Sequence, residues 1–457
     1  MANRRALPAV HRVLAADSLR DAMARWGVGQ VRGAVRDALA GLRAEIAAGA
    51  PAPGIDGIAD LALTRLRRHT APAFPRVVNA TGVVIHTNLG RAPGLAVENW
   101  GYLALEYDLD GGVRGERLRP VTERLTRYFG CEAATVVTNT AAALLLLLAA
   151  HASGREVVVS RGELIEIGGS FRLPDVMRAA GVRLVEVGCT NRTHHDDYAA
   201  AIGDATAGIL VVHRSNFSLD GFVATPDLAE LVALGHRHGV PVWVDQGSGC
   251  HLDLAQFHLR PEPTVRALLG AGADAVLFSG DKLFGGPQAG VLLGTERTIG
   301  PLQHHPLRRA LRPDKSVLAG LAAVTDAYLA GHWGDVPLYR LVACPHEELR
   351  RRAERLRRAL GRAGIRATVV ATRAAIGGGT TPGQTLPSWA IAIPGGRRVA
   401  QALRRGTLPV VARVEQDEVM LDLRAVFPEE DRDLLAAIRA AVASSAGPSA
   451  AGTDGAD

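Results

Sequence analysis

The apolar residues in the middle of the chain gather in short runs rich in valine, isoleucine and leucine. Helical stretches, such as residues 141–152 and 226–238, or polar loops separate most of these runs. This rhythm predicts an α/β fold, a mostly parallel sheet with crossover helices. The seven runs are Ala134–Val137, Glu156–Val159, Arg183–Val187, Ile209–Val212, Pro241–Val244, Ala275–Phe278 and Gly290–Leu293. Such sheets bind ligands at the carboxyl ends of their strands, so the residues after each run are the first candidates for a functional site.

The first 70 residues show a different pattern, with apolar residues at three- and four-residue spacing. The apolar stripe of one predicted helix consists of Val28, Val31, Val35, Leu39, Leu42 and Ile46. Arg32, Arg36 and Arg43 lie within about 40° of one another on that helix and form a ridge of positive charge beside the stripe. A break at residues 48–54 and a proline-containing linker at 71–75 predict a separate helical domain over residues 1–70.

The end of the chain combines an arginine-rich helical stretch at residues 347–363 with strand-like runs at 388–393, 408–414 and 419–423. This pattern predicts a smaller C-terminal α/β domain over residues 326–444, following a large domain over residues 71–325. The small and polar residues 445–457 predict a disordered tail.

The length and composition agree with a multidomain globular protein, because 457 residues exceed what one hydrophobic core usually serves. The longest apolar run, Ala141–Ala150, is too short to span a bilayer, and the N-terminus has no segment resembling a secretion signal. The four cysteines form no CxxC pair, which argues against a zinc site or a disulfide framework. We therefore expect a cytoplasmic protein with no membrane partner and no metal site.

The net charge of +6 is concentrated at the N-terminus, where residues 1–70 hold 11 arginines against 6 acidic residues. A basic domain on a nearly neutral body suggests a polyanionic partner, with nucleic acid as the first candidate. The alternative is a solvated helical surface, and charge alone does not decide between the two.

Lysine is rare in this chain, since only Lys282 and Lys315 occur among 52 basic residues. Arginine keeps its proton at any working pH, whereas a lysine amine can form a Schiff base with a carbonyl. Lys282 follows the run that ends at Phe278, with the hydroxyl of Ser279 three residues before it. An amine and a hydroxyl at a strand end suit pyridoxal phosphate, whose ring nitrogen also requires an acid. Asp245 ends another run and is the predicted acid; the alternatives are a surface ammonium for Lys282 and a turn-capping role for Asp245.

The phosphate of such a cofactor requires a helix N-terminus or a nest of amides. Thr138, Asn139 and Thr140 stand where a strand-like run passes directly into a helical stretch, and ordinary N-capping would use the same residues. A dinucleotide site is the competing hypothesis, but no G-x-G-x-x-G motif follows any of the runs.

Three arginines are candidates for binding an anion. Arg91 follows a turn-like Thr-Asn-Leu-Gly sequence, and Arg309 and Arg312 lie about one helical turn apart. Two guanidinium groups on one helix face can clamp an anion through paired hydrogen bonds. A solvated helix face is the alternative for the Arg309 and Arg312 pair.

Several long segments resemble bacterial selenocysteine synthase, the L-seryl-tRNA(Sec) selenium transferase family. The resemblance covers nearly the whole chain and includes the lysine segment 279–290. The other resembling segments are residues 78–93, 160–172, 190–194, 213–217, 306–315, 376–379 and 421–424.

This resemblance implies a fold-type I pyridoxal-phosphate enzyme with Lys282 as the Schiff-base lysine and Asp281 as a second catalytic residue. It also implies that Arg91, Arg309 and Arg312 form the pocket for selenophosphate, with Asn216 lining the same site. The family's N-terminal domain binds the tRNA, in agreement with the basic segment, and the family assembles as rings of dimers. No role is assigned to Lys315.

The implied function is conversion of seryl-tRNA(Sec) to selenocysteinyl-tRNA(Sec), through a pyridoxal-phosphate aldimine, loss of the seryl hydroxyl and addition of selenium from selenophosphate. One alternative is a related β-eliminating lyase that acts on a small phosphorylated amino acid, since the same arginines would hold any phosphate. The other is a non-catalytic tRNA-binding homologue. The basic N-terminal domain argues against the lyase, and the intact lysine, aspartate and arginine set argues against the binding protein.

Overall fold

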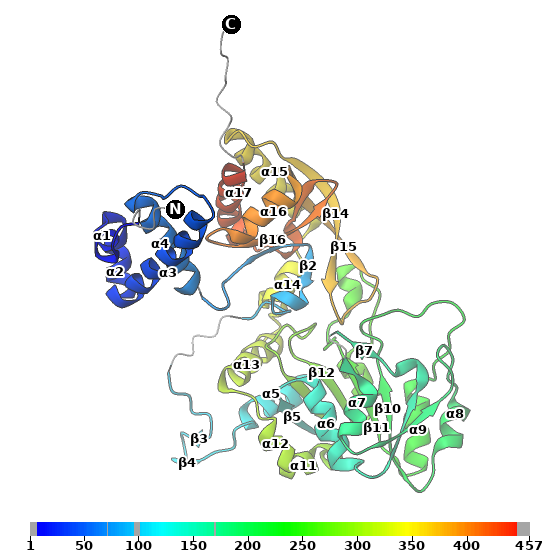
Figure 1. The fold of residues 1–457 in the computed structure, drawn as a ribbon. Helices are drawn as coiled ribbons and strands as arrows, with labels where there is room; N and C mark the ends of the chain where they lie inside the picture. The colour runs from blue at the N-terminus through cyan, green and yellow to red at the C-terminus, as the bar shows by residue number, and fades with distance from the viewer. Residues whose placement is uncertain (1–6, 71, 96–100, 169–170, 446–457) are drawn as a thin grey trace. The chain divides into compact units, whose positions relative to one another are not determined.

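The computed structural model describes residues 7–70, 72–95, 101–168 and 171–445 (Figure 1). The chain divides into two compact units, residues 1–76 and residues 77–457. The first unit ends six residues later than the predicted helical domain. The predicted large and small domains fall together in the second unit, and the predicted tail lies outside the described residues except for Ser445, which ends the last helix.

The first unit is helical, as its three- and four-residue spacing predicts. It contains α1 (Val10–Leu14), α2 (Arg20–Trp26), α3 (Val28–Ala47) and α4 (Ile55–Thr70). The middle of the predicted stripe on α3 is buried, from Val31 to Leu42, whereas Val28 at its start is 49% exposed because it opens the helix. The predicted arginine ridge on α3 is exposed to solvent.

The second unit is built on the predicted seven-stranded sheet. Its strand order is β5-β13-β12-β11-β10-β6-β9, and all pairs are parallel except those that β13 makes with β5 and β12. The strands are β5 (Ala133–Val137), β6 (Glu156–Ser160), β9 (Arg183–Val187), β10 (Thr206–Val212), β11 (Val242–Gly247), β12 (Ala275–Ser279) and β13 (Gly290–Gly294). The α/β class and the mostly parallel sheet are therefore confirmed.

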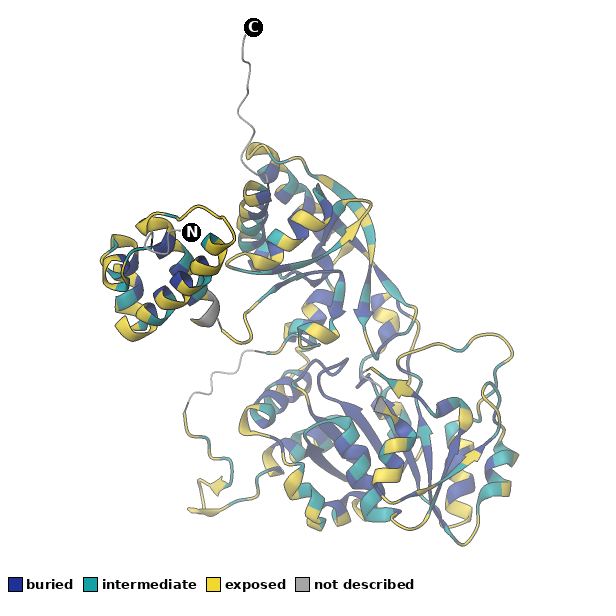
Figure 2. Ribbon diagram, in the orientation of Figure 1, coloured by how far each residue is buried: buried dark blue, intermediate teal, exposed yellow. Residues whose placement is uncertain are grey.

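Both faces of this sheet are covered, which explains why its strands are apolar along their whole length. On β12, Val276 and Phe278 pack into a cluster with α5 (Arg119–Phe129) and α13 (Lys315–Leu329), while Ala275 and Leu277 pack into a cluster with α6 (Thr140–His151). Figure 2 shows the buried strands between helices that expose their outer faces.

A second, six-stranded sheet has the order β1-β16-β17-β15-β14-β2. Its strands are β1 (Val78–Ala80), β2 (Val83–Ile85), β14 (Thr368–Gly377), β15 (Thr385–Pro394), β16 (Val410–Glu415) and β17 (Glu418–Asp422). The segment 78–85 was expected in the large domain but supplies strands to this C-terminal sheet, because β1 pairs with β16 and β2 with β14. The sheet packs against α15 (His346–Arg362), α16 (Gly396–Arg405) and α17 (Asp431–Ser445).

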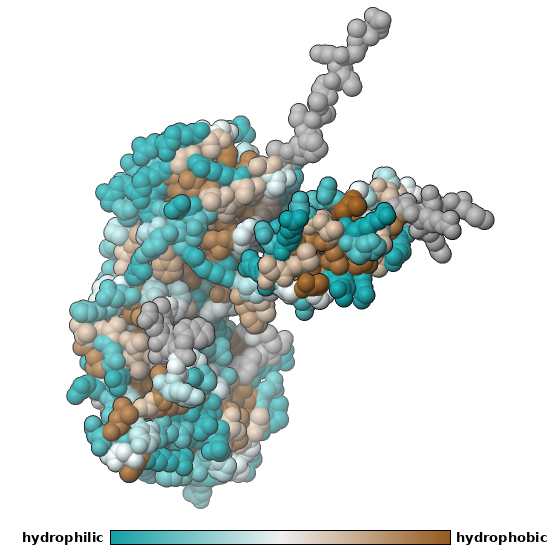
Figure 3. All heavy atoms as spheres, turned by 90° about the vertical axis from the view of Figure 1, so that its left-hand side faces the viewer, coloured by the Kyte–Doolittle hydropathy of each residue, from teal (hydrophilic) through white to brown (hydrophobic). Residues whose placement is uncertain are grey.

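Shorter elements complete the second unit. They are β3 (Tyr107–Asp108), β4 (Val113–Arg114), β7 (Glu166–Ile167), β8 (Phe171–Arg172), α7 (Leu173–Ala179), α8 (His195–Ala201), α9 (Leu228–Arg237), α10 (Val265–Gly270), α11 (Glu296–His304), α12 (Pro306–Ala310) and α14 (Pro337–Val342). On the face shown in Figure 3, hydrophilic and hydrophobic residues are mixed. Within the described part of the chain, no helix has both the length and the apolar character needed to cross a bilayer.

Candidate active site

The carboxyl ends of the central strands open onto a cavity of about 290 Å³, where the strand-end rule places a ligand. Six of the predicted site residues line it: Arg91, Asn139, Thr140, Asp245, Ser279 and Lys282. They come from the loop after β2, the β5–α6 turn, β11 and the segment that follows β12. The fold thus brings residues together that lie almost 200 positions apart in the sequence.

Lys282 supplies a buried amine to this cavity, with only 6% of the residue exposed. Burial lowers the pKa of its ammonium, and the positive charge of Arg91 lowers it further, while Asp245 and Asp281 act in the opposite direction. A lowered pKa increases the fraction of neutral amine, which is the form that attacks a carbonyl carbon.

Asp245 lies on β11 and points a buried carboxyl group into the same cavity. Burial raises the pKa of this carboxyl to about 6, although the nearby charges of Lys282 and His213 lower it. A cation placed against Asp245 would favour its ionised form. The residue is therefore suited to pair with a protonated ring nitrogen.

The opposite end of the cavity is suited to an anion. Asn139 is the N-cap of α6, and its side chain accepts a hydrogen bond of 2.9 Å from the amide of Ala142. The hydroxyl groups of Thr140 and Ser279 lie 2.8 Å apart, which joins the helix N-terminus to the end of β12. The two hydroxyls and the positive end of the helix dipole are suited to an anion such as a phosphate.

Thr138 does not line the cavity, although it belongs to the predicted phosphate turn. Its amide donates to the carbonyl of Leu311 at 3.1 Å, so it connects β5 to the segment after α12. Its expected role as a phosphate ligand stays a prediction.

Arg91 and Asp281 form an ion pair at the edge of the cavity. The guanidinium Nη1 lies 3.2 Å from both carboxylate oxygens, and Asp281 is 4% exposed. Arg91 has a φ of 66°, a left-handed conformation that is uncommon outside glycine. The pair is supported by a hydrogen bond from the amide of Ala92 to the carbonyl of Asp281.

The remaining predicted anion ligands lie elsewhere in the single chain. Arg309 and Arg312 line a second cavity of about 370 Å³. The helix α12 ends at Ala310, so Arg312 lies beyond it rather than on a shared helix face, and it forms an ion pair with Glu106 at 3.3 Å. Asn216 donates to the carbonyl of Glu166 at 2.8 Å and is exposed.

Sequence reasoning assigned no role to His213, which also lines the cavity and whose Nε2 lies 3.6 Å from a carboxylate oxygen of Glu262. Glu262 in turn accepts hydrogen bonds from the hydroxyl of Ser248 and from the amide of Thr381. His213 directly follows β10, so the strand-end rule was a usable signal for it. Glu262 follows no strand, and nothing in the sequence indicated it.

The hairpin of β14 and β15 also reaches the site. A Cβ atom added to Gly379 would lie 2.5 Å from Nζ of Lys282, so only glycine fits there without displacing the lysine. The residue also has a φ of +78°, which glycine adopts without strain. The C-terminal sheet thus covers one side of the reactive amine.

A buried lysine after one strand, an aspartate on the neighbouring strand and a helix N-terminus with two hydroxyls surround one cavity. The fold is that of the fold-type I pyridoxal-phosphate enzymes. The solved structure of a D-glucosaminate-6-phosphate ammonia-lyase has a similar fold, with a TM-score of 0.57 and 20% sequence identity over 83% of this chain and 99% of that one.

A family model described as L-seryl-tRNA selenium transferase matches residues 77–427. An L-seryl-tRNA(Sec) selenium transferase of Geobacter sulfurreducens is 44% identical over 95% of this chain and 98% of its own length. One from Moorella thermoacetica is 45% identical over 95% of this chain and 96% of its own length. The chain belongs to the L-seryl-tRNA selenium transferase family.

Proposed function

We propose that the protein converts seryl-tRNA(Sec) to selenocysteinyl-tRNA(Sec) with selenophosphate as the selenium donor. The observation that carries this proposal is the buried amine of Lys282 beside Asp245, in a cavity that ends at the phosphate site of α6. Membership of the family and the activity named for its relatives support the choice of substrate.

The residues of the cavity fit pyridoxal phosphate. Asn139, Thr140 and Ser279 would hold its phosphate, Asp245 its ring nitrogen and Lys282 its aldehyde carbon. When bound, this cofactor withdraws electrons from the Cα of an attached amino acid, so that the Cα proton becomes acidic. Electrostatic interactions are stronger in a cavity of low dielectric constant than in water, so this cavity would strengthen the contacts of these residues with the cofactor.

The side chains of the protein would carry out the remaining steps. Once seryl-tRNA is bound, the amine of Lys282 would be free to accept the proton from the seryl Cα. Its lowered pKa suits this role, because a neutral amine is available at neutral pH. The β-hydroxyl would take up a proton and leave as water. Selenium would then add to the carbon that carried the hydroxyl, a proton would return to Cα, and water would cleave the phosphorus–selenium bond so that phosphate is released.

We further propose that selenophosphate is held by Arg91, Arg309 and Arg312, with Asn216 and Asp281 nearby. In a single chain, Arg91 lines one cavity while the other two arginines line another. If all three serve one anion, then a second copy of the chain must supply part of the site. This requirement supports the homo-oligomer, a ring of dimers, that the family implies.

The first unit is the proposed tRNA-binding part of the molecule. Its exposed Arg32, Arg36 and Arg43 lie on one helix, and arginine binds phosphate oxygens through paired hydrogen bonds. A substrate as small as a free amino acid would need no such surface.

The test uses the two lysines of the chain as a matched pair. The protein is incubated with seryl-tRNA(Sec), pyridoxal phosphate and selenophosphate, and selenocysteinyl-tRNA is assayed. Lys282→Ala should abolish turnover and the visible absorbance of the lysine-bound cofactor. Lys315→Ala should change neither, because its side chain is exposed and its ammonium donates to the carbonyl of Gly101, outside the cavity. A persisting absorbance band in Lys282→Ala would contradict the assignment.

The same assay separates the alternatives. If the unmodified protein binds tRNA tightly but shows no turnover, the result would favour a non-catalytic tRNA-binding protein. Elimination from a small phosphorylated amino acid, without tRNA binding, would favour the lyase.

A further inference from the structure

Three tyrosines and one histidine form a buried polar cluster against the turn that carries Lys282. Tyr128 belongs to α5, Tyr328 to α13 and Tyr339 to α14, while His251 lies in the loop after β11. The ring centroids of His251 and Tyr328 are 4.2 Å apart, and those of Tyr128 and Tyr328 are 5.4 Å apart. Three helices and a strand loop therefore meet at one point beside the reactive lysine.

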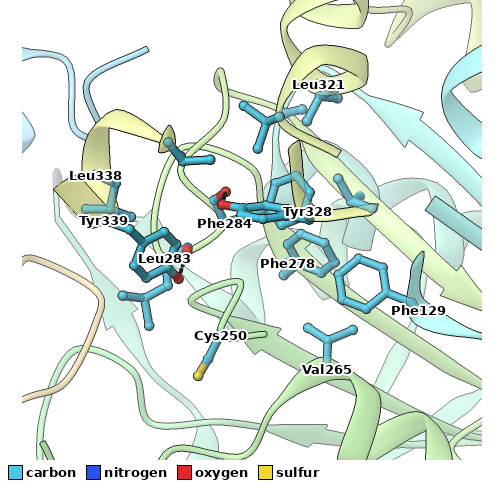
Figure 4. Close-up of a cluster of buried hydrophobic side chains, with 14 of the residues drawn as sticks. Phe129, Cys250, Val265, Phe278, Leu283, Phe284, Leu321, Tyr328, Leu338 and Tyr339 are labelled. Atoms are coloured by element: carbon cyan, nitrogen blue, oxygen red, sulfur yellow. Dashed lines mark hydrogen bonds between the residues drawn. The ribbon is translucent and has the colours of Figure 1, made fainter. Parts of the chain in front are cut away.

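The hydroxyl groups of this cluster bind the backbone of the lysine turn. Tyr339 donates to the carbonyl of Leu283 at 2.5 Å, and Tyr328 donates to the carbonyl of Phe284 at 2.6 Å. Figure 4 shows both tyrosines beside these two residues, which directly follow Lys282. The carbonyl of Lys282 itself accepts from the amide of Gly285 at 2.9 Å. Three successive carbonyls of the turn thus have defined donors.

The directions of the hydrogen bonds determine the tautomer of His251. The single hydroxyl proton of Tyr339 goes to the carbonyl of Leu283, so its oxygen must accept from Nε2 of His251 at 3.2 Å. Nδ1 is then the acceptor for the hydroxyl of Tyr128, at 2.8 Å. The hydrogen bonds run in one direction, from Tyr128 through His251 and Tyr339 to the turn.

The imidazole stays neutral, as this arrangement requires. Burial, and to a smaller extent the positive charge of Arg266, lower the pKa of His251 to about 3. A neutral ring with one donor and one acceptor nitrogen matches its two tyrosine partners over the whole physiological pH range.

Packing alone does not account for the hydroxyl groups. Phe129, Phe278 and Phe284 fill the same cluster without polar atoms, and burying a hydroxyl has a desolvation cost that a phenyl ring avoids. The amine of Lys282 stands at the end of a flexible side chain with four methylene groups, so its placement depends on how firmly its backbone is held. Displacement of a reacting group by 1 Å can reduce a rate by ~100-fold.

We propose that Tyr339 and His251 are positioning residues for Lys282: their hydrogen-bond chain to the carbonyl of Leu283 holds the turn so that the amine lies in the cavity. This inference rests on the proposed function only in the role that it gives to Lys282. Neither residue is among those that line the cavity, so both would act through the backbone of the turn.

The substitution Tyr339→Phe keeps the aromatic ring and removes one hydroxyl. The matched control is Tyr198→Phe, because Tyr198 is equally buried but belongs to a different hydrophobic cluster, away from the lysine turn. In the cofactor-free protein, hydrogen exchange of the amides from Leu283 to Gly286 should become faster in Tyr339→Phe. The same amides should exchange at the normal rate in Tyr198→Phe.

The cofactor-loaded protein gives the second measurement. In Tyr339→Phe the pH titration of the visible absorbance of the lysine-bound cofactor should shift. Exchange of the seryl Cα proton with solvent should slow by ~10-fold or more, while the KM for seryl-tRNA stays within about twofold of the normal value. A change in stability alone would not shift the titration, because it changes the amount of folded protein and not the pKa of the lysine-bound cofactor.

A double substitution tests whether the residues act as one chain. If they do, His251→Leu combined with Tyr339→Phe should slow proton exchange no more than the slower single variant. Additive losses, an unchanged titration in Tyr339→Phe or an equal loss in Tyr198→Phe would each overturn the proposal. If Tyr339→Phe fails to fold, Tyr128→Phe tests the outer link and should give a smaller slowing at unchanged KM.

Failure of the proposed function is distinguishable from failure of this inference. Absence of turnover with seryl-tRNA in the unsubstituted protein contradicts the function. The absorbance titration and the amide exchange still report whether Tyr339 and His251 hold the Lys282 turn.

Discussion

Asp245 and Lys282 are oppositely charged groups whose burial disfavours both charges. Burial raises the pKa of Asp245 to about 6 and lowers that of Lys282, so each group moves towards neutrality in the absence of a ligand. A positively charged ring nitrogen beside Asp245 would reverse the first shift. Ionised Asp245 therefore destabilises the ligand-free protein, and a cation bound beside it would remove this effect.

This cost predicts a pH-dependent stability difference for Asp245→Asn in the cofactor-free protein. The folded-state pKa of about 6 exceeds the usual aspartate value of 3.8, so the contribution of Asp245 to stability is greatest at low pH and is lost as the pH rises through 6. At pH 8 the amide should stabilise the fold by about 2–3 kcal/mol relative to the carboxylate, and at pH 5 by about half as much. Thermal unfolding at the two pH values measures the difference.

The exposed Asp204 provides the control, since Asp204→Asn removes the same charge without removing a buried one. A stabilisation by Asp245→Asn that is equal at pH 5 and pH 8 would contradict the argument. Turnover should be lost in Asp245→Asn at either pH, because the neutral amide cannot stabilise a charged ring nitrogen.

At the scale of elements, α6 combines two roles in one N-terminus. Its cap, Asn139, accepts a hydrogen bond from the amide of Ala142, and the first residues of the helix line the cavity. The sequence left these two roles open as alternatives. The structure shows that Asn139 caps the helix. The same turn lines the cavity, so N-capping and phosphate binding are compatible roles.

A comparison of two helix caps separates these roles. Asn139→Ala and Asp227→Ala each remove an N-cap, since Asp227 caps α9 by accepting from the amides of Ala229 and Glu230. Each should lower the free energy of unfolding by about 1 kcal/mol. Only Asn139→Ala should also weaken the binding of pyridoxal phosphate, by ~10-fold, as measured by titration of the cofactor absorbance. Equal cofactor affinity in both variants would contradict a phosphate site at α6.

The elements themselves were largely predictable. All seven apolar runs form strands of the main sheet, because a strand buried on both faces has an apolar signal of its own. The three-residue strands β1 and β2 were not predicted as strands, and their residues were assigned to the large domain. Sequence periodicity carries no information about which partner a short strand pairs with, and their partners β14 and β16 come more than 280 residues later.

At the scale of the whole molecule, the charge of the chain is divided between the two compact units. The excess of arginine in the first 70 residues belongs to the helical first unit, which has its own hydrophobic core. A separate basic unit beside a nearly neutral body fits a polyanionic substrate that is much larger than the cavity.

Removing the arginine ridge should therefore affect tRNA binding but not the cofactor. Changing Arg32, Arg36 and Arg43 to Gln should weaken seryl-tRNA(Sec) binding and reduce its salt dependence, by up to about 3 in the slope of log K against log salt. Filter binding at several salt concentrations measures both. The cofactor absorbance should be unchanged.

The control is an equal loss of charge elsewhere, by changing Arg351, Arg355 and Arg358 of α15 to Gln. These three arginines are also exposed and lie on a single helix. Equal weakening of tRNA binding by the two sets would indicate non-specific electrostatic attraction rather than a binding surface on the first unit.

The sequence by itself determined the α/β class, the seven strands, the separate basic unit and the central pair of Lys282 and Asp245. These properties depend on local patterns and on the rule that ligands bind at strand ends, so neighbouring residues are sufficient to indicate them. Only the tertiary structure decided which distant groups surround that pair. It brings Gly379 against the amine, Glu262 against His213 and Tyr339 against the lysine turn. It also separates Arg91 from Arg309 and Arg312, because contacts between segments far apart in the chain follow from packing and not from spacing along the sequence.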